Sequence, residues 1–236
     1  FSTSRTLNHR TSDGQPTPTL TAAEAELTGI ALGLAAAGKG ALDAKPIPRE
    51  QALWAMRSRL AYDDRFAAEI GKRAEAFCTL ESNDAGVLLS RMKHGVVPRA
   101  MLNITWFAEH ALSLQDRPIE TEQATHLVRH DPAGVVAIIT PWNAPLMLAT
   151  WKLGPALAAG NCVIVKPPEW APLTSSLLAD CAHAAGLPPG VLNIVQGAGA
   201  STGARLVSDP RLARISFTGS VPTAKWIAQS AGANLV

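Results

Sequence analysis

The chain has 236 residues and a formal net charge of +2, with 47% hydrophobic and 17% charged residues. This composition is typical of a soluble globular protein with one large or two modest domains. No cluster of Lys and Arg stands out to neutralise a row of phosphates, so we expect no nucleic-acid partner. The apolar windows at 27–37 and 144–160 are interrupted by Gly, Pro or Lys, and we expect no membrane span. Without a secretion signal or a disulfide spacing, a cytoplasmic location is expected.

The first half of the chain is predicted to be mostly helical. Residues 1–48, rich in Thr, Ser, Pro and Gly, indicate an amino-terminal arm with one helix near 21–37. Residues 49–115 have a helical pattern, and we expect these helices to cover a sheet. Residues 116–131 alternate weakly and predict an edge strand or hairpin. Four apolar residues of the helical segment are spaced to share a face: Phe66, Ile70, Phe77 and Leu80.

Residues 132–236 show a strand and helix alternation. A helix-like segment from Pro172 to Ala185 stops at Gly186, and similar segments separate the other strands. Strands separated by helices predict an α/β fold with a doubly wound, mostly parallel sheet. The four strand-sized apolar runs are Val135 to Ile139, Cys162 to Val165, Val191 to Val195 and Ala213 to Phe217.

Asn143 follows the first of these strands, where ligands of open parallel sheets collect. An Asn before Pro145 is most often a helix N-cap, which is the plainer interpretation. The alternative is an amide that donates its N–H to a carbonyl oxygen that becomes negative on nucleophilic attack, an interaction worth about 3 to 4 kcal/mol. Trp142 either lines the pocket or belongs to the core.

Lys166 and Glu169 follow the second strand, at about the spacing at which dinucleotide-binding folds place an acidic residue on the ribose hydroxyls. They are equally compatible with a solvated ion pair beside a Pro-Pro turn. No G-x-G-x-x-G sequence follows the first strand, so the phosphates must be bound elsewhere. Two later loops are candidates: the glycine-rich 196–203, and 217–222, in which Ser220 precedes a helix start. Taken alone, Ser220 is more often an N-cap than a ligand.

Four motifs together resemble the aldehyde dehydrogenase superfamily. They are Thr140-Pro141-Trp142-Asn143, Lys166-Pro167-Pro168-Glu169, the segment 186–195, and Phe217-Thr218-Gly219-Ser220, in the family's order and spacing. The resemblance extends from about 118 to 231, with 49–117 compatible. Val97-Pro98-Arg99-Ala100 and Trp106-Phe107-Ala108 look most like the branch that acts on muconic semialdehydes. One departure is Ala224, where the family usually has Gly.

The resemblance implies NAD(P)-dependent oxidation of an aldehyde to a carboxylic acid on a Rossmann-like cofactor domain. In this family a Cys thiolate attacks the aldehyde, the Asn that matches Asn143 holds the oxyanion, and a Glu activates the water that hydrolyses the thioester. NAD is the expected cofactor because Glu169 repels a 2′-phosphate, although Lys166 makes NADP possible. No metal is implied. The residues that the resemblance places at the cofactor are Ile139, Thr140, Pro141, Trp142, Lys166, Pro168, Glu169, Gly199, Gly203, Phe217, Thr218, Gly219 and Ser220.

The family's nucleophilic Cys and general-base Glu are expected beyond Val236, together with the catalytic domain. Cys78, Cys162 and Cys181 lie in apolar patterns that predict inert, buried thiols. The resemblance also implies a homodimer or homotetramer that pairs through the hairpin at 116–131. Two hypotheses stay open: the cofactor part of an aldehyde dehydrogenase, or a catalytically incomplete fragment that binds NAD or forms oligomers.

Overall fold

The computed structural model of the chain describes residues 65–113, 117–128, 130 and 132–232. The arm predicted for 1–48 lies outside these residues, as do 49–64 and the last four residues. The predicted domain boundaries therefore stay a prediction.

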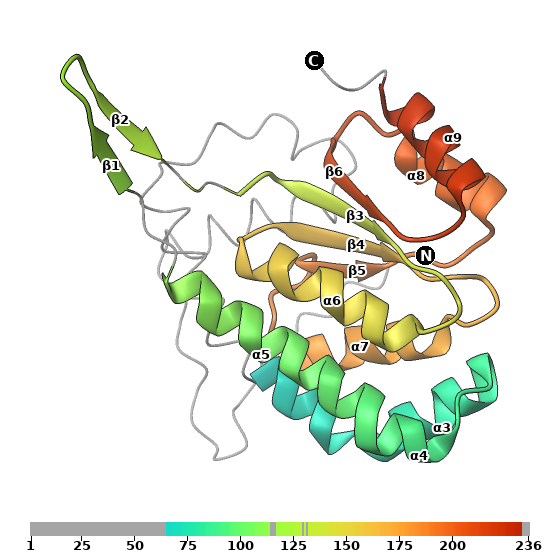
Figure 1. Ribbon diagram of the computed structural model, residues 1–236. Helices are drawn as coiled ribbons and strands as arrows, with labels where there is room; N and C mark the ends of the chain where they lie inside the picture. The colour runs from blue at the N-terminus through green and yellow to red at the C-terminus, as the bar shows by residue number, and fades with distance from the viewer. Residues whose placement is uncertain (1–64, 114–116, 129, 131, 233–236) are drawn as a thin grey trace.

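A four-stranded parallel sheet organises the second half of the chain (Figure 1). Its strands are β3 (Val135–Ile139), β4 (Cys162–Lys166), β5 (Leu192–Ile194) and β6 (Leu212–Phe217). The order is β5-β4-β3-β6, so the chain moves outward from β3 to β5 and then returns to the other side of β3. This reversal makes the carboxyl ends of β3 and β6 the topological switch point, where ligands bind in such sheets.

Helices cover both faces of this sheet, which confirms the doubly wound prediction. Figure 1 shows α6 (Pro145–Ala158) and α7 (Leu173–Ala184) on one side, and α8 (Ala204–Val207) and α9 (Val221–Gly232) on the other. A π-helical turn, η2 (Gly199–Gly203), leads into α8. In the two central strands, β3 and β4, residues on both faces are buried, which explains why these strands are continuous apolar runs. Residues of the outer strands β5 and β6 are only partly buried or exposed.

The helices of the first half form a further layer over α6 and α7. They are α3 (Ala74–Ala85), α4 (Leu89–Arg91), the π-helical η1 (Met92–Val96) and α5 (Val97–Ser113), preceded by helical residues 65–72. In this layer α5 packs along α6 and α3 packs on α7. Of the four residues predicted to share a face, Phe66, Ile70 and Phe77 are fully buried in one core with residues of α6, α7 and the sheet. Leu80 is only partly buried.

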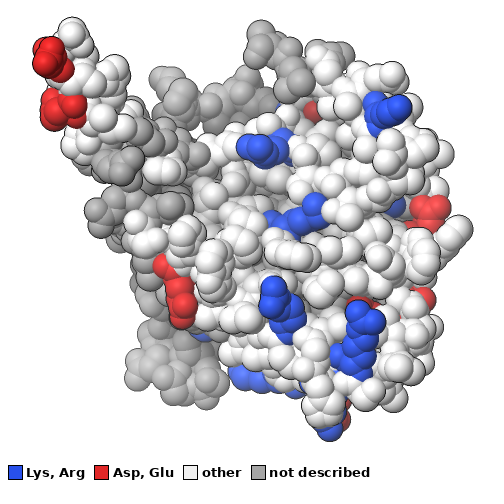
Figure 2. All heavy atoms as spheres, viewed as in Figure 1, with Lys and Arg blue, Asp and Glu red and all other residues white. Residues whose placement is uncertain are grey.

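Residues 117–128 form an antiparallel hairpin that protrudes from the rest of the chain (Figure 1). Its strands are β1 (Arg117–Glu120) and β2 (Thr125–Val128), which confirms the predicted hairpin. The residues from 118 to 127 are exposed, and Figure 2 shows acidic side chains gathered at the tip. On the same face of the molecule, Lys and Arg are scattered rather than gathered.

Candidate functional site at the carboxyl ends of the strands

The loops that carry the predicted site residues lie together because the parallel strands all end at one edge of the sheet. Backbone hydrogen bonds extend the pairing one residue past β3, β5 and β6. Thr140 N donates to Lys166 O at 3.3 Å, Thr218 N donates to Ile139 O at 3.1 Å, and Val195 N donates to Val165 O at 2.9 Å. The starts of the four loops are thus fixed relative to one another.

Lys166 is the last residue of β4, and its side chain is buried with only 4% of the residue exposed. The ammonium Nζ donates to Pro167 O at 2.9 Å and lies 3.9 Å from Glu169 Oε2, a separation too long for a hydrogen bond. Burial lowers the pKa of Lys166, and the carboxylate of Glu169 opposes this shift. The interpretation as a solvated pair is therefore wrong for Lys166, while Glu169 is exposed.

The glycine-rich loop after β5 is bound to the same pair of residues. Gly199 N donates to Glu169 Oε2 at 3.0 Å. A Cβ at Gly203 would lie 3.6 Å from two methylene carbons of Lys166, so the turn η2 packs along the lysine stem. Gly197 has φ +138° and approaches Thr202 so closely that a side chain there would overlap it. The structure thus brings the loop that carries Lys166 and Glu169 into contact with the glycine-rich loop 196–203.

Asn143 is exposed in the loop between β3 and α6, and it is not an N-cap. The N-cap position of α6 is Ala144, which offers no side-chain hydrogen bond. The capping prediction is therefore wrong, because the helix begins one residue later than an Asn143 cap would require. Trp142 is 57% exposed, which excludes a core role for it within the described structure.

The N-terminus of α6 is instead capped by Glu81, a residue that the sequence analysis missed. Glu81 Oε2 accepts a hydrogen bond from Leu146 N at 3.0 Å, and the side chain is fully buried. No sequence signal could have identified this contact, since Glu81 lies on α3, 65 residues before its partner.

Ser220 caps the N-terminus of α9, which confirms the plainer interpretation of this residue. Its Oγ accepts a hydrogen bond from Thr223 N at 3.3 Å and lies 2.8 Å from Thr223 Oγ1. At Gly219 a Cβ would overlap the ring of Phe217, so a side chain there would displace this ring. Ala224 N donates to Ser220 O at 3.0 Å in the first turn of the helix. The switch point thus carries a helix N-terminus, an arrangement that favours anions.

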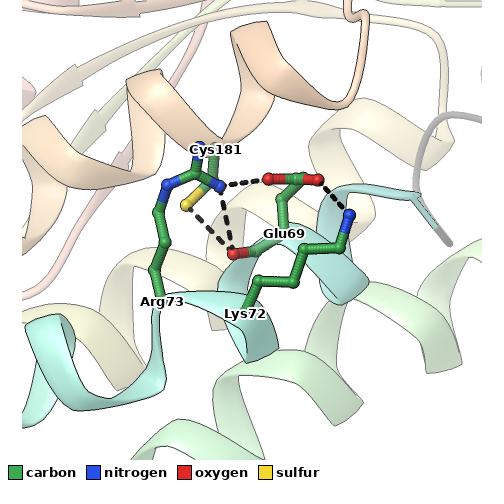
Figure 3. A network of polar contacts seen from close by, with 4 residues as sticks. All are labelled: Glu69, Lys72, Arg73 and Cys181. Carbon is green, nitrogen blue, oxygen red and sulfur yellow. Dashed lines mark hydrogen bonds and ion pairs between the residues drawn. The ribbon is translucent and has the colours of Figure 1, made fainter. Parts of the chain in front are cut away.

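None of the three cysteines is suited to act as a nucleophile. All are buried, and burial raises the pKa of Cys78 and raises that of Cys181 to about 11. Figure 3 shows Cys181 against the backbone of Glu69, where its Sγ donates to Glu69 O at 3.7 Å. Arg73 and Lys72 form ion pairs with the Glu69 carboxylate in the same network, which joins the start of the helical layer to α7.

Neither a metal-binding cluster nor a membrane-spanning helix is found in residues 65–113, 117–128, 130 and 132–232. Among these residues no His, Cys, Asp and Glu side chains form a group of three that could hold a metal ion. No helix within the same ranges has the length and apolar character needed to cross a membrane.

Comparison with known proteins gives a consistent result. The sequence profile of the Aldehyde dehydrogenase family matches residues 15–236. The chain is 40% identical over 181 residues to 2-aminomuconic semialdehyde dehydrogenase of Homo sapiens, covering 75% of this chain and 37% of the relative. It is 39% identical over 177 residues to 2-aminomuconic 6-semialdehyde dehydrogenase of a Pseudomonas species, covering 71% and 35%. The chain therefore spans little more than a third of the length of these relatives.

Solved structures of similar proteins agree with the sequence comparison. PnpE of a Pseudomonas species, crystallised in complex with nicotinamide adenine dinucleotide, superposes with a TM-score of 0.76 at 30% identity, covering 90% of this chain and 41% of that protein. HpcC of Thermus Thermophilus gives a TM-score of 0.72 at 41% identity, covering 76% and 35%.

Proposed function

Because this chain belongs to the aldehyde dehydrogenase family, we propose that it supplies the cofactor site and the oxyanion amide for NAD(P)-dependent oxidation of an aldehyde to a carboxylic acid. The observation that supports this most strongly is the cluster formed by Lys166, Glu169 and Gly199 at the edge of the sheet where nucleotides bind.

The Lys166 and Glu169 pair suits a ribose diol. An ammonium has three N–H donors, and Pro167 O takes one of them. Within the described residues the other two donors and Glu169 Oε1 have no hydrogen-bond partner. The N–H donors of Lys166 and the carboxylate acceptor of Glu169 thus lie side by side, so they can bind the two neighbouring hydroxyls of a ribose. Glu169 would repel a 2′-phosphate, which favours NAD, whereas Lys166 attracts it and keeps NADP possible.

The N-terminus of α9 suits the pyrophosphate. Backbone N–H groups at a helix start, together with the helix dipole, favour a negative ligand. This helix begins directly after β6 at the switch point, so a nucleotide held there would reach across the carboxyl end of β3. When bound, NAD(P) supplies the hydride acceptor.

Asn143 suits the role of oxyanion donor. Its carboxamide is exposed, it caps no helix, and the strand pairing fixes the start of its loop. An amide N–H held in this way donates to the aldehyde oxygen as negative charge develops on it, which lowers the barrier to nucleophilic attack. The attacking thiolate must come from outside the described residues, since the cysteines within them are buried.

A semialdehyde is the proposed class of substrate, since two relatives are named for 2-aminomuconic semialdehydes. Assembly into a homodimer or homotetramer through the hairpin β1–β2 and a cytoplasmic location are proposed as well. The second candidate function is a fragment that binds NAD without chemistry of its own. The observation that favours it is that all three cysteines of the described residues are buried, so none of them offers an accessible nucleophile.

The test uses the complete product of the gene that encodes this chain. We expect it to form NADH from a panel of aldehydes, with semialdehydes among the best substrates. Asn143→Ala should lower kcat by about a hundredfold to a thousandfold while the Kd for NAD changes little. Asn83→Ala, an exposed amide on α3, is the matched control and should leave kcat unchanged. Binding of NAD without NADH formation from any aldehyde would support the second candidate instead.

A further inference from the structure

Two carboxylates near the end of α3, Glu81 and Asp84, cap the helices that follow the two main loops of the site. Glu81 Oε2 accepts from Leu146 N in α6 and from Thr174 Oγ1 in α7, both at 3.0 Å. Asp84 Oδ2 accepts from Leu173 N, the first residue of α7, at 2.9 Å. Since side chains three residues apart lie on the same side of a helix, one turn of α3 reaches both helix starts.

Neither α6 nor α7 has a side-chain cap of its own. The N-cap positions are Ala144 and Pro172, and neither makes a side-chain hydrogen bond. The first backbone N–H groups of a helix need an external acceptor, and the positive end of the helix dipole favours a negative one. The carboxylates of α3 meet both requirements at once.

These caps lie close in sequence to the proposed functional groups. Asn143 is three residues before Leu146, and Glu169 is four residues before Leu173. A single oxygen of Glu81 thus links the loop of the oxyanion amide to the helix that follows the ribose pair. A shift of α6 or α7 at this point would move one loop relative to the other.

Packing alone does not account for a carboxylate at this place. Glu81 is fully buried, and in the described structure its Oε1 has no hydrogen-bond partner. Desolvation of a carboxylate is unfavourable, and an apolar side chain of similar volume would avoid it. Burial raises the pKa of the Glu81 carboxyl, and the hydrogen bonds from Leu146 and Thr174 oppose this shift. A polar group at this buried position is explained because its two hydrogen bonds hold two helix starts in one arrangement.

We infer that Glu81 is a positioning residue of the active site, which sets the oxyanion amide of Asn143 against the ribose-binding loop by capping α6 and binding α7. This inference rests on the proposed function, because it assigns Glu81 an effect on that reaction. Glu81 itself touches neither substrate nor cofactor in this account; it acts through the two loops.

The first test compares three variants of the complete gene product below their melting temperatures. Glu81→Ala should lower kcat by about tenfold to a hundredfold, the range for a small misplacement of catalytic groups. Glu81→Gln should recover most of this loss, because its amide oxygen can accept the same two hydrogen bonds. Glu75→Ala removes an exposed carboxylate of the same helix and should match the wild type. A lower melting temperature for Glu81→Ala with an unchanged kcat would overturn the inference and leave a purely structural role.

The second test shows whether the effect passes through Asn143. In an Asn143→Ala background, Glu81→Ala should produce little further loss of kcat, whereas independent effects would multiply. Full multiplication would overturn the inference. A wild-type protein that forms no NADH would instead overturn the proposed function itself.

Amide hydrogen exchange provides a readout that does not depend on turnover. In Glu81→Ala, exchange at residues 146–148 should become about fivefold to a hundredfold faster, because a buried backbone N–H loses its acceptor. Faster exchange should also appear at the start of α7, and neither change should occur in Glu75→Ala. Unchanged exchange at both helix starts would overturn the inference, whether or not the protein is an active enzyme.

Discussion

Substitution of Lys166 by Met tests the proposed ribose contact with a magnitude that follows from the geometry. Met has a similar length and replaces the buried ammonium by an apolar end, so it removes the desolvation that lowers the pKa of Lys166. We therefore expect the fold to be retained. The two N–H donors that point to no acceptor in the described residues would be lost, and a hydrogen bond involving a charged group is worth about 1.5 to 3 kcal/mol. Net loss of one such hydrogen bond to the ribose should raise the Kd for NAD by about tenfold to a hundredfold.

Isothermal titration calorimetry of NAD into the complete gene product measures this change directly. Lys72→Met is the matched control, because Lys72 is exposed and its removal changes the net charge equally. The affinity of the wild type for NAD should also fall as pH rises. Because burial lowers the pKa of Lys166, this fall should begin at a lower pH than the usual lysine pKa of 10.5 would give. A Kd for Lys166→Met within about twofold of the control, a difference of well under 1 kcal/mol, would refute the contact.

Three further predictions concern stability and reactivity. Gly154→Ala should destabilise the fold by about 1 to 3 kcal/mol in urea unfolding, because its Cβ would lie 2.8 Å from Asn103 O where α5 crosses α6. Cys181 should resist iodoacetamide at pH 8 in the native protein and react once guanidinium unfolds it, since burial raises its pKa to about 11. Asp209→Asn should cost about 1 kcal/mol at pH 7, because the hydrogen bonds from the partly exposed Arg211 lower the pKa of Asp209 to about 2. This stability is present above the unfolded pKa near 3.8 and is lost as pH falls through about 2.

Each of these three predictions has an outcome that would refute it. Gly95→Ala places its Cβ in open space, and a loss of stability as large as that of Gly154→Ala would refute the packing argument. Native labelling of Cys181 as fast as in guanidinium would show that the thiol is accessible. A constant difference between wild type and Asp209→Asn from pH 7 down to pH 2 would show that the ion pair does not carry the effect.

The sequence predicted the elements of the sheet well because local signals define them. The strand expected at Val135 to Ile139 has those bounds in the structure, and the helix expected at Pro172 to Ala185 spans Leu173–Ala184. The strand is a continuous apolar run, the helix has apolar residues at helical spacing, and both are bounded by turn residues. The order β5-β4-β3-β6 was not predicted, since periodicity does not show which strands are neighbours.

The candidate site was predicted in part, and its errors have physical causes. The sequence motif predicted that Lys166 and Glu169 lie in one turn. Only the fold shows that Lys166, at the end of β4, is buried while Glu169 is exposed. Asn143 was expected as an N-cap from the following proline, yet tertiary contact supplies that cap from Glu81. Contacts between residues far apart in sequence decide both points, and local pattern contains no record of them.

A crystal structure of the complete gene product with NAD tests the central claim most directly. We predict the adenosine ribose on Lys166 and Glu169, the pyrophosphate at the start of α9, and the Asn143 amide facing the nicotinamide end. Density for the nucleotide at any other place, with the edge formed by β3, β4 and β6 left empty, would contradict it.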